Sequence, residues 1–273
     1  SPGWCRVMSV RTIARKDLAD ASRSKALWAV ILIVLLSTAG ITTLLAVTSD
    51  MAAGEVFSLS FQLAVTMLPI VALVLAKGAI TAERESGSLR VLLSLPPSRR
   101  DVLVGKLLGR TALMLVATLI SGFVTGLVVL TILGGTFGSL AAFIGFLGLM
   151  GVAFVAIGVG ISAGSSSDSR ATAVAVGAYM ILVALWNLIQ SAIQYGAVEL
   201  GLMTEGSAPA WMKLVGLFPP NRAARAAYRN TVGGQLFGTD PFASVWLPVL
   251  LLLAWIVVPV TIGYLRLRDA QIG

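Results

Sequence analysis

Apolar residues fill five long stretches of this chain that contain no Asp, Glu, Lys or Arg. They are residues 26–49, 56–76, 111–167, 171–198 and 241–265, with lengths of 24, 21, 57, 28 and 25 residues. A helix needs about 20 apolar residues to cross the hydrocarbon core of a bilayer, so each stretch is long enough to span it. The strands of a transmembrane barrel would instead show alternating segments of roughly 10 residues. The pattern therefore predicts an all-α polytopic membrane protein.

The 57-residue stretch is too long for a single span, because a helix of that length would measure about 85 Å. Residues 134–139 form a glycine-rich turn that divides it. Two glycine pairs at four-residue spacing, Gly122/Gly126 and Gly160/Gly164, indicate close packing between helices. We therefore expect six transmembrane helices, at about residues 26–47, 58–79, 111–133, 140–163, 172–194 and 245–265.

Charge predicts the orientation of these spans. The chain holds 20 Lys+Arg against 12 Asp+Glu, and 16 of the 20 basic residues fall in segments on the same side as the two termini. Cytoplasmic loops of membrane proteins carry an excess of Lys and Arg. We therefore expect a multi-pass protein of the cell (plasma) membrane with both termini in the cytoplasm.

The first 25 residues differ from the rest of the chain. Apolar residues recur there at helical spacing beside several basic ones, which is typical of an amphipathic helix lying in the headgroup layer. A solvated basic leader is the alternative. We divide the chain into this N-terminal interfacial helix (1–25) and a six-span transmembrane domain (26–273). The first apolar run is too long and starts too late for a cleavable signal peptide.

Composition excludes several kinds of chemistry. The chain has no histidine and one cysteine, Cys5, so it has no imidazole base, no internal disulfide and no site for a metal held by His or several Cys. The segment Gly160-Ile-Ser-Ala-Gly164 formally matches the hydrolase elbow, but that chemistry needs a histidine. The basic residues flank spans instead of forming a patch, so we expect no nucleic-acid partner. We predict no catalytic residue and no metal site.

The loop between the second and third spans, residues 80–110, has an unusual pattern. A charge-dense start leads into a leucine-rich stretch that ends at Pro96-Pro97. Ser98 is then placed to cap a new helix that carries Asp101 in its first turn and continues into the third span. Topology alone would explain the basic residues but not the acids. An apolar face beside acidic residues favours a partner protein over anionic headgroups, which would repel them.

The sequence from Thr81 to Arg100, TAERESGSLRVLLSLPPSRR, followed by Gly105-Lys106, resembles the signature of ABC type-2 exporter permeases, and of their NosY-like branch in particular. The motif covers about 30 residues, and the topology covers the whole chain. The resemblance implies a homodimer, or a pair with a close paralogue, seated on two copies of a separate ATPase (nucleotide-binding) subunit. That subunit would hold ATP and Mg. This chain has no Gly-x-x-x-x-Gly-Lys-Ser/Thr motif, so we expect no cofactor and no ATP hydrolysis in it.

The resemblance also implies roles for individual residues. A coupling helix that seats in a groove of the ATPase subunit would contain Glu83, Arg84, Glu85, Gly87, Leu89, Arg90, Leu93 and Ser94. The turn and helix that follow it would contain Pro96, Ser98, Arg99 and Lys106. The loop 164–170 corresponds to a second cytoplasmic contact, formed by Ser167, Asp168 and Arg170.

The loop between the fifth and sixth spans, residues 195–244, is too short for a separate domain and holds short helices. Asn221, after Pro219-Pro220, is placed to cap a helix of about ten residues that ends before Gly233-Gly234. Arg222, Arg225, Tyr228 and Arg229 on this helix are candidates for an external gate. The cluster could also dock an extracytoplasmic partner or an anionic substrate, and anchoring to membrane lipid headgroups is the alternative.

Polar residues recur at helical spacing within the fifth span, at Asn187, Gln190 and Gln194. Such residues usually face the bundle interior or a cavity, so they indicate either a translocation path or hydrogen bonding between helices. A secondary transporter driven by an ion gradient would need intramembrane carboxylates or histidines, and the predicted spans contain only Lys77 as a charged residue. A non-transporting membrane scaffold stays open, and an intramembrane enzyme is disfavoured. Drug, lipid, peptide and glycan substrates all stay open.

Overall fold

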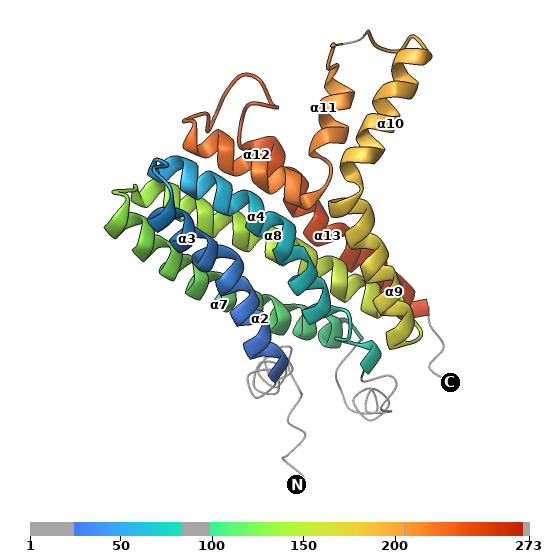
Figure 1. Ribbon diagram of the computed structural model, residues 1–273. Coiled ribbons are helices and arrows are strands. Elements are labelled where there is room, and N and C mark those ends of the chain that lie inside the picture. The colour runs from blue at the N-terminus through green and yellow to red at the C-terminus, as the bar shows by residue number, and fades with distance from the viewer. Residues whose placement is uncertain (1–24, 83–98, 205, 270–273) are drawn as a thin grey trace.

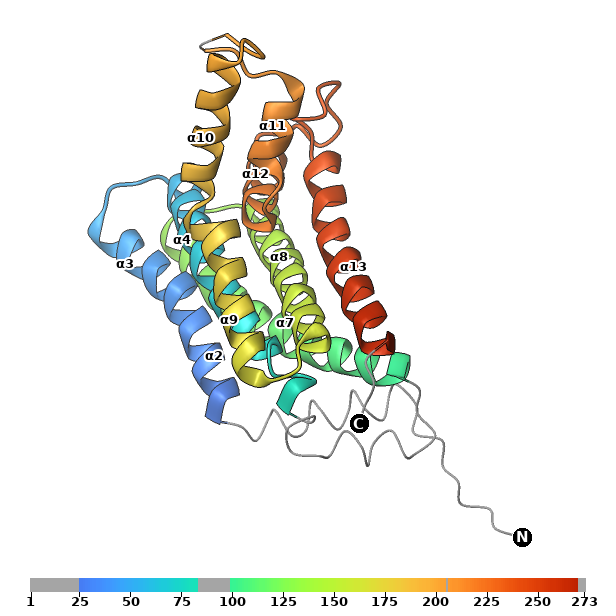
Figure 2. The same cartoon turned by 90° about the vertical axis from the view of Figure 1, so that its right-hand side faces the viewer.

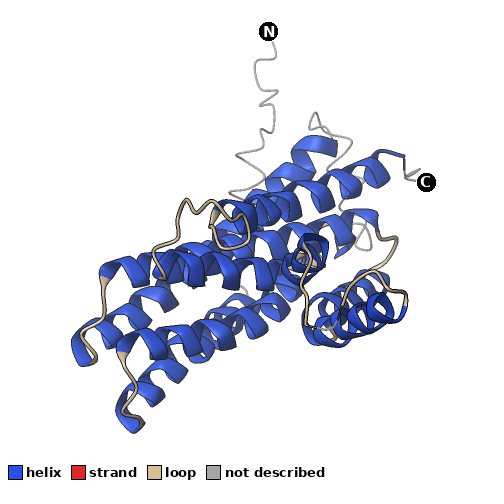
Figure 3. Ribbon diagram, turned by 90° about the horizontal axis from the view of Figure 1, so that it is seen from above, coloured by secondary structure: helices blue, strands red, loops and turns tan. Residues whose placement is uncertain are grey.

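The computed structural model describes residues 25–82, 99–204 and 206–269 of the chain (Figure 1). Within these ranges every regular element is a helix and no strand occurs (Figure 3). Five of the described helices are long and apolar enough to cross a membrane, and a bent helix pair makes six if it counts as one span. The chain is therefore an all-α polytopic membrane protein. The predicted interfacial helix and the predicted coupling helix lie outside the described residues.

The first span contains a π turn. It consists of α2 (Lys25–Leu35), the π segment η1 (Leu36–Gly40) and α3 (Ile41–Thr48), close to the predicted 26–47. The second span, α4 (Ala53–Ala76), starts five residues earlier than predicted. Glu55 is the reason, because its carboxylate accepts a hydrogen bond from the Ala52 N–H at 3.3 Å and so caps the helix. Glu55 comes directly before the charge-free run 56–76, and in the structure it belongs to the first turn of the helix.

The third and fourth spans are long helices on either side of the glycine turn. They are α7 (Arg99–Ile132) and α8 (Phe137–Gly164). The prediction that a helix starting after Ser98 runs without a break into the third span is confirmed. Gly134 has φ of +66° at the turn, and the Thr136 hydroxyl accepts a hydrogen bond from the Ser139 N–H at 3.3 Å to cap α8.

The fifth predicted span, residues 172–194, corresponds to a bent pair of helices and not to one continuous helix. The chain forms α9 (Asp168–Tyr179), a π segment η2 (Met180–Ala184) and α10 (Trp186–Glu199), with a 60° bend between the two halves. The Leu185 N–H donates to the Met180 carbonyl at 2.7 Å, an i to i+5 bond that identifies a π bulge as the cause of the bend. Beyond it α10 and the short helix α11 (Ala210–Leu217) project past the ends of α4 and α8 (Figure 2).

Helix α12 (Pro220–Val232) starts one residue before the predicted N-cap. Its N-cap is Pro219, Pro220 is the first helical residue, and Asn221 is buried within the helix, so the capping role predicted for Asn221 is wrong. The predicted end before Gly233-Gly234 is confirmed, and Gly234 has φ of +75°. The chain then returns through α13 (Trp246–Asp269), close to the predicted sixth span.

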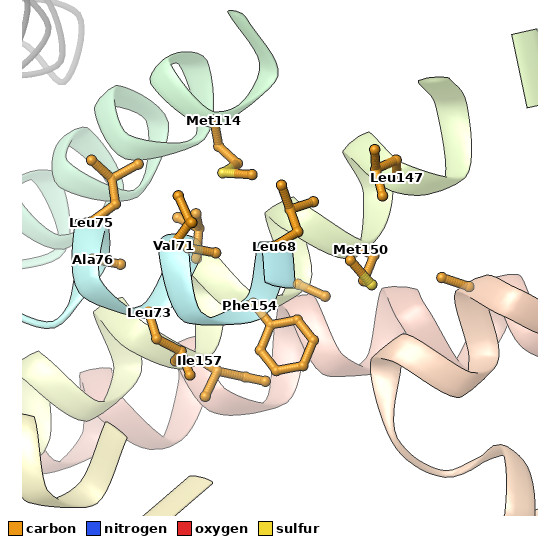
Figure 4. Close-up of a cluster of buried hydrophobic side chains, with 14 of the residues drawn as sticks. Leu68, Val71, Leu73, Leu75, Ala76, Met114, Leu147, Met150, Phe154 and Ile157 are labelled. Atoms are coloured by element: carbon orange, nitrogen blue, oxygen red, sulfur yellow. The ribbon is translucent and has the colours of Figure 1, made fainter. Parts of the chain in front are cut away.

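Helix α8 is the centre of the bundle, and α4, α7, α12 and α13 all pack against it. Figure 4 shows the core, in which Leu68 and Val71 of α4 meet Met114 of α7 and Met150 and Phe154 of α8. Small residues allow the tightest crossings. A Cβ at residue 158 would lie 2.6 Å from the Cβ of Ala76, and one at residue 160 would overlap the Pro259 carbonyl oxygen. A Cβ at residue 122 or 126 would likewise lie 2.4 Å from a side-chain carbon of α8, so the predicted glycine pairs act in helix packing.

Candidate functional site

Two polar clusters link helices that are far apart in the sequence. The Lys77 cluster lies where α4 ends and α9 begins, and it consists of Lys77, Thr81, Ser162, Asp168 and Thr172. The Arg222 cluster lies where α12 starts beside the bend of the fifth span, and it consists of Asn187, Gln190, Asn221, Arg222 and Arg225.

An ion pair forms the centre of the Lys77 cluster. The Lys77 ammonium lies 2.9 Å from the Asp168 carboxylate and donates a second hydrogen bond to the Thr172 hydroxyl at 2.7 Å. The Thr81 hydroxyl donates to the other carboxylate oxygen of Asp168 at 3.1 Å. The side chains of Lys77 and Asp168 are 22% and 35% exposed, so the pair is only partly solvated. It connects the end of α4 to the start of α9.

Ser162 completes this cluster from α8. Its hydroxyl is fully buried and accepts hydrogen bonds from the Ile80 N–H at 2.9 Å and the Thr81 N–H at 3.1 Å. These two backbone groups lie in the turn after α4, so Ser162 satisfies donors that would otherwise be buried without partners. Sequence reasoning did not identify Ser162, Lys77, Thr81 or Thr172 as site residues. A serine inside a span is a weak signal, because it also occurs in helix packing.

The predicted residues of the second cytoplasmic contact surround the same point. Ser167 caps α9 by accepting a hydrogen bond from the Arg170 N–H at 3.3 Å. Arg170 is exposed, and its guanidinium donates to the Ser166 hydroxyl at 3.2 Å. The base of loop 80–110 and the residues predicted for the second contact are therefore joined through Asp168.

Most residues assigned to the coupling helix and the turn after it lie outside the described residues. These are Glu83, Arg84, Glu85, Gly87, Leu89, Arg90, Leu93, Ser94, Pro96 and Ser98. Arg99 is the first residue of α7, and Lys106 is buried within that helix at 8% exposure.

Arg222 forms the centre of the second cluster and joins α12 to α10. Its guanidinium donates to the Gln190 side-chain oxygen at 2.7 Å and to the Asn187 side-chain oxygen, and it also reaches the Gly216 carbonyl at 3.4 Å. The structure thus brings together two sets of residues that the sequence suggested separately. All three acceptors are neutral amide oxygens, so among the described residues the positive charge of Arg222 is hydrogen-bonded without being neutralised.

Other polar atoms of the Arg222 cluster have no partner among the described residues. The Nε of Arg225 and the Oδ1 of Asn221 are buried and make no hydrogen bond there. Burial, followed by the neighbouring positive charge on α12, lowers the pKa of both Arg222 and Arg225 from the usual arginine value. Buried donors and acceptors are nearly always paired, so unpaired ones are a place where a ligand or partner can bind.

The remaining residues of the two predicted sets lie apart from this contact. Tyr228 is buried, and its ring stacks on Phe61 of α4 with centroids 4.3 Å apart, so it lies in the core rather than beside the arginines. Burial raises the pKa of Tyr228 to about 12. Arg229 is exposed on α12. Gln194 is exposed on α10, where it lines a cavity of about 390 Å³ with Ser191 and Glu199.

Aromatic residues hold the bend of the fifth span next to the Arg222 cluster. The Trp186 indole donates to the Val215 carbonyl at 3.1 Å, and its ring stacks on Phe218. The Trp255 indole of α13 donates to the Phe218 carbonyl at 2.6 Å. The turn between α11 and α12 is therefore fixed between the fifth and sixth spans.

No group of three or more cysteine, aspartate or glutamate side chains in residues 25–82, 99–204 and 206–269 is arranged to hold a metal ion. The two clusters consist of arginine and lysine side chains, one carboxylate, side-chain amides and hydroxyls.

Comparison with known proteins adds a further finding. A family model described as "ABC-2 family transporter protein" matches residues 11–271. The probable ABC transporter permease protein NosY of Pseudomonas aeruginosa is 36% identical over 200 residues, which cover 67% of this chain and 70% of the relative. The probable ABC transporter permease protein NosY of Stutzerimonas stutzeri is 29% identical over 280 residues, which cover 95% of this chain and 98% of the relative. Both polar clusters fall within the range that the family model matches.

Proposed function

The chain belongs to the ABC-2 family of transporter proteins and is a membrane permease subunit of an ABC transporter, and we propose that this transporter is an exporter. In this proposal the chain forms the translocation path as a homodimer, or with a close paralogue. The family implies an ABC ATPase as partner, and we propose two copies of it, which bind ATP and Mg. Both termini lie in the cytoplasm of a cell whose plasma membrane holds the complex.

The observation that carries the coupling mechanism is the link between Thr81 and Asp168 at 3.1 Å. Thr81 lies at the base of loop 80–110, which would contain the coupling helix. Asp168 starts α9, the first half of the bent span. We propose that movement of the loop on the ATPase subunit reaches the fifth span through this link. Ser162 supports the same route, because it holds the turn after α4 against the central helix α8.

We propose that the Arg222 cluster contacts cargo, or an extracytoplasmic partner, at the outer part of the path. A charged residue packed among spans is costly, so an arginine held there is a functional-site candidate. Arg222 is joined to the second half of the bent span at Asn187 and Gln190. A change in the bend would therefore move Arg222 and its neighbour Arg225. In this proposal the cluster acts as an external gate.

The test is a charge reversal in the coupling loop of the full chain, purified with its ATPase and reconstituted. Glu83→Lys with Glu85→Lys should leave the protein inserted and keep basal ATP hydrolysis, but it should abolish stimulation by cargo. Candidate drugs, lipids, peptides and glycans serve as the probes. Glu199→Lys with Asp240→Lys is the matched control, because it makes the same charge change in the loop region between spans five and six.

Three outcomes are informative. Loss of stimulation in the loop variant alone supports coupling through the loop. Unchanged assembly and unchanged stimulation in that variant would overturn the assignment. An ATPase that co-purifies with the wild-type chain but is never stimulated by any cargo would favour the non-transporting scaffold.

A further inference from the structure

A groove runs along the bundle between α9 and α13, both of which pack on α8. It has a volume of about 860 Å³. Its walls are mostly apolar, and Val174 of α9 and Ile181 of η2 line it together with Val258 and Ile262 of α13. These four side chains are each about half exposed. The separation of α9 and α13 on either side of α8 is visible in Figure 2.

One end of the groove is basic. Arg170 of α9 and Arg266 of α13 line it there, beside the hydroxyls of Ser165 and Ser166. Both arginines are exposed, and neither makes an ion pair with a carboxylate among the described residues. Gly164 makes room at this point, because a Cβ there would lie 3.0 Å from the Cδ of Arg266. The basic end therefore has two guanidinium groups available to an anion.

The length of the groove fits one leaflet of a bilayer. Trp255 is the groove-lining residue of α13 that is farthest along the helix from Arg266. It lies 11 residues before Arg266 on the same helix, a distance of about 16 Å at 1.5 Å per residue. The hydrocarbon core of a bilayer is about 30 Å thick, so the groove extends from one surface to about the midplane. A molecule that fits it has an anionic head and an apolar tail about as long as one leaflet is thick.

We propose that this groove binds an anionic phospholipid of the leaflet at the basic end, with the phosphate on Arg170 and Arg266 and an acyl chain along α9 and α13. The positive-inside pattern assigns that end to the cytoplasmic leaflet, where anionic lipids are concentrated. The site is separate from the Arg222 cluster and does not depend on the direction of transport. A bound lipid would fill the space beside α9, the helix that begins at Asp168.

The test measures which lipids the full chain retains. The chain is purified in mixed micelles that contain equal amounts of phosphatidylglycerol and phosphatidylcholine, and native mass spectrometry counts the bound molecules. The wild type should retain phosphatidylglycerol with a preference on the order of tenfold, as expected for two basic residues at a membrane surface. Arg170→Gln with Arg266→Gln should reduce that preference to about onefold.

Two further variants distinguish binding of the lipid headgroup from binding of the acyl chain. Arg268→Gln removes a charge two residues from Arg266 on the same helix but outside the groove, and it should keep the preference. Ala173→Phe fills the groove without changing a charge, and it should reduce retention of both lipids. The Ala173 variant also keeps the proposal testable if the double arginine variant is poorly folded.

The proposal is overturned if the wild type retains the two lipids equally, or if Arg268→Gln abolishes the preference as the double variant does. It is also overturned if a second copy of the chain occupies the groove. Val174→Cys in a Cys5→Ser background tests that occupant, because Cys5 is the only native cysteine. Efficient disulfide formation between two copies at residue 174 would show that protein, not lipid, covers the groove.

Discussion

The Lys77 cluster and the Arg222 cluster both tie distant helices together, but they differ in how completely their polar atoms are paired. In the Lys77 cluster a carboxylate neutralises the ammonium, and hydroxyls fill the remaining positions. In the Arg222 cluster the guanidinium meets only neutral oxygens, and Arg225 and Asn221 keep buried atoms without partners in the described residues. The first arrangement suits a mechanical link. The second leaves a positive charge for an anionic group.

The helices also pack more tightly around the Lys77 cluster than around the Arg222 cluster. Near the Lys77 cluster, α8 crosses α4 and α13 with backbones almost in contact, and a Cβ at residue 263 would lie 2.8 Å from the Cα of Gly160. Near the Arg222 cluster, α10 leaves the bundle at a 60° bend and carries many exposed side chains. We therefore expect substitutions in the first region to change stability, and those in the second to change function more than stability.

The largest expected effect on stability comes from comparing the same substitution at one glycine in each region. Gly160→Leu places a side chain where the Pro259 carbonyl lies. It should therefore lower the free energy of unfolding by more than about 3 kcal/mol, which exceeds the usual effect of overpacking. Gly196→Leu in α10 is the matched control, because no atom lies within 4 Å of a Cβ there. That control should be neutral or slightly stabilising, since leucine favours helix over glycine. Thermal unfolding in detergent measures both, and equal losses would contradict the comparison.

An intermediate effect is expected at the ion pair. Asp168→Asn keeps the shape of the side chain but leaves Lys77 without its counter-charge. The pair is partly exposed, so we expect a loss of about 1–2 kcal/mol, between the values for surface and buried pairs. Lys77→Met in the same chain should recover most of it, because it removes the unpaired charge.

The readout for this pair is a double-mutant cycle on the unfolding midpoint, together with cargo-stimulated ATP hydrolysis. If the ion pair carries movement from the loop to α9, the double variant should regain stability without regaining stimulation. Recovery of both would show that the ion pair only stabilises the fold, and coupling would then depend on the Thr81 hydroxyl, which can still donate to the introduced asparagine.

The sequence predicted the spans well because the bilayer sets their length. Charge-free runs and one glycine turn were enough to locate α8 and the C-terminal end of α7 within a few residues, and the predicted cap at Ser98 located the start of α7 at Arg99. Thr81 and Lys77 were beyond such reasoning, because their partner Asp168 lies 87 and 91 residues away. Nothing in a single sequence without an alignment indicates which distant residues meet.

The bend in the fifth span could not be predicted for a related reason. No proline lies between residues 172 and 194, so the local sequence favours a continuous helix. The π turn lies next to tertiary contacts, since Trp186 bonds to the Val215 carbonyl and Gln190 bonds to Arg222. The core position of Tyr228 could not be predicted either. Helical spacing places Tyr228 near the arginines, but it does not show that Phe61 of another helix packs on its ring.

The smallest expected effect on stability, and the sharpest on function, lies in the Arg222 cluster. Arg222→Gln removes the link between α12 and α10, so hydrogen exchange in residues 186–199 should rise, while global stability falls by only about 1 kcal/mol. Arg225→Gln removes a buried donor that has no partner among the described residues, so stability should stay the same or rise slightly. If the cluster contacts an anionic group, both variants should lose cargo-stimulated ATP hydrolysis although only Arg222→Gln loosens α10. Loss of stimulation in Arg222→Gln alone would show that the cluster acts by holding α10 in place and not by binding an anion.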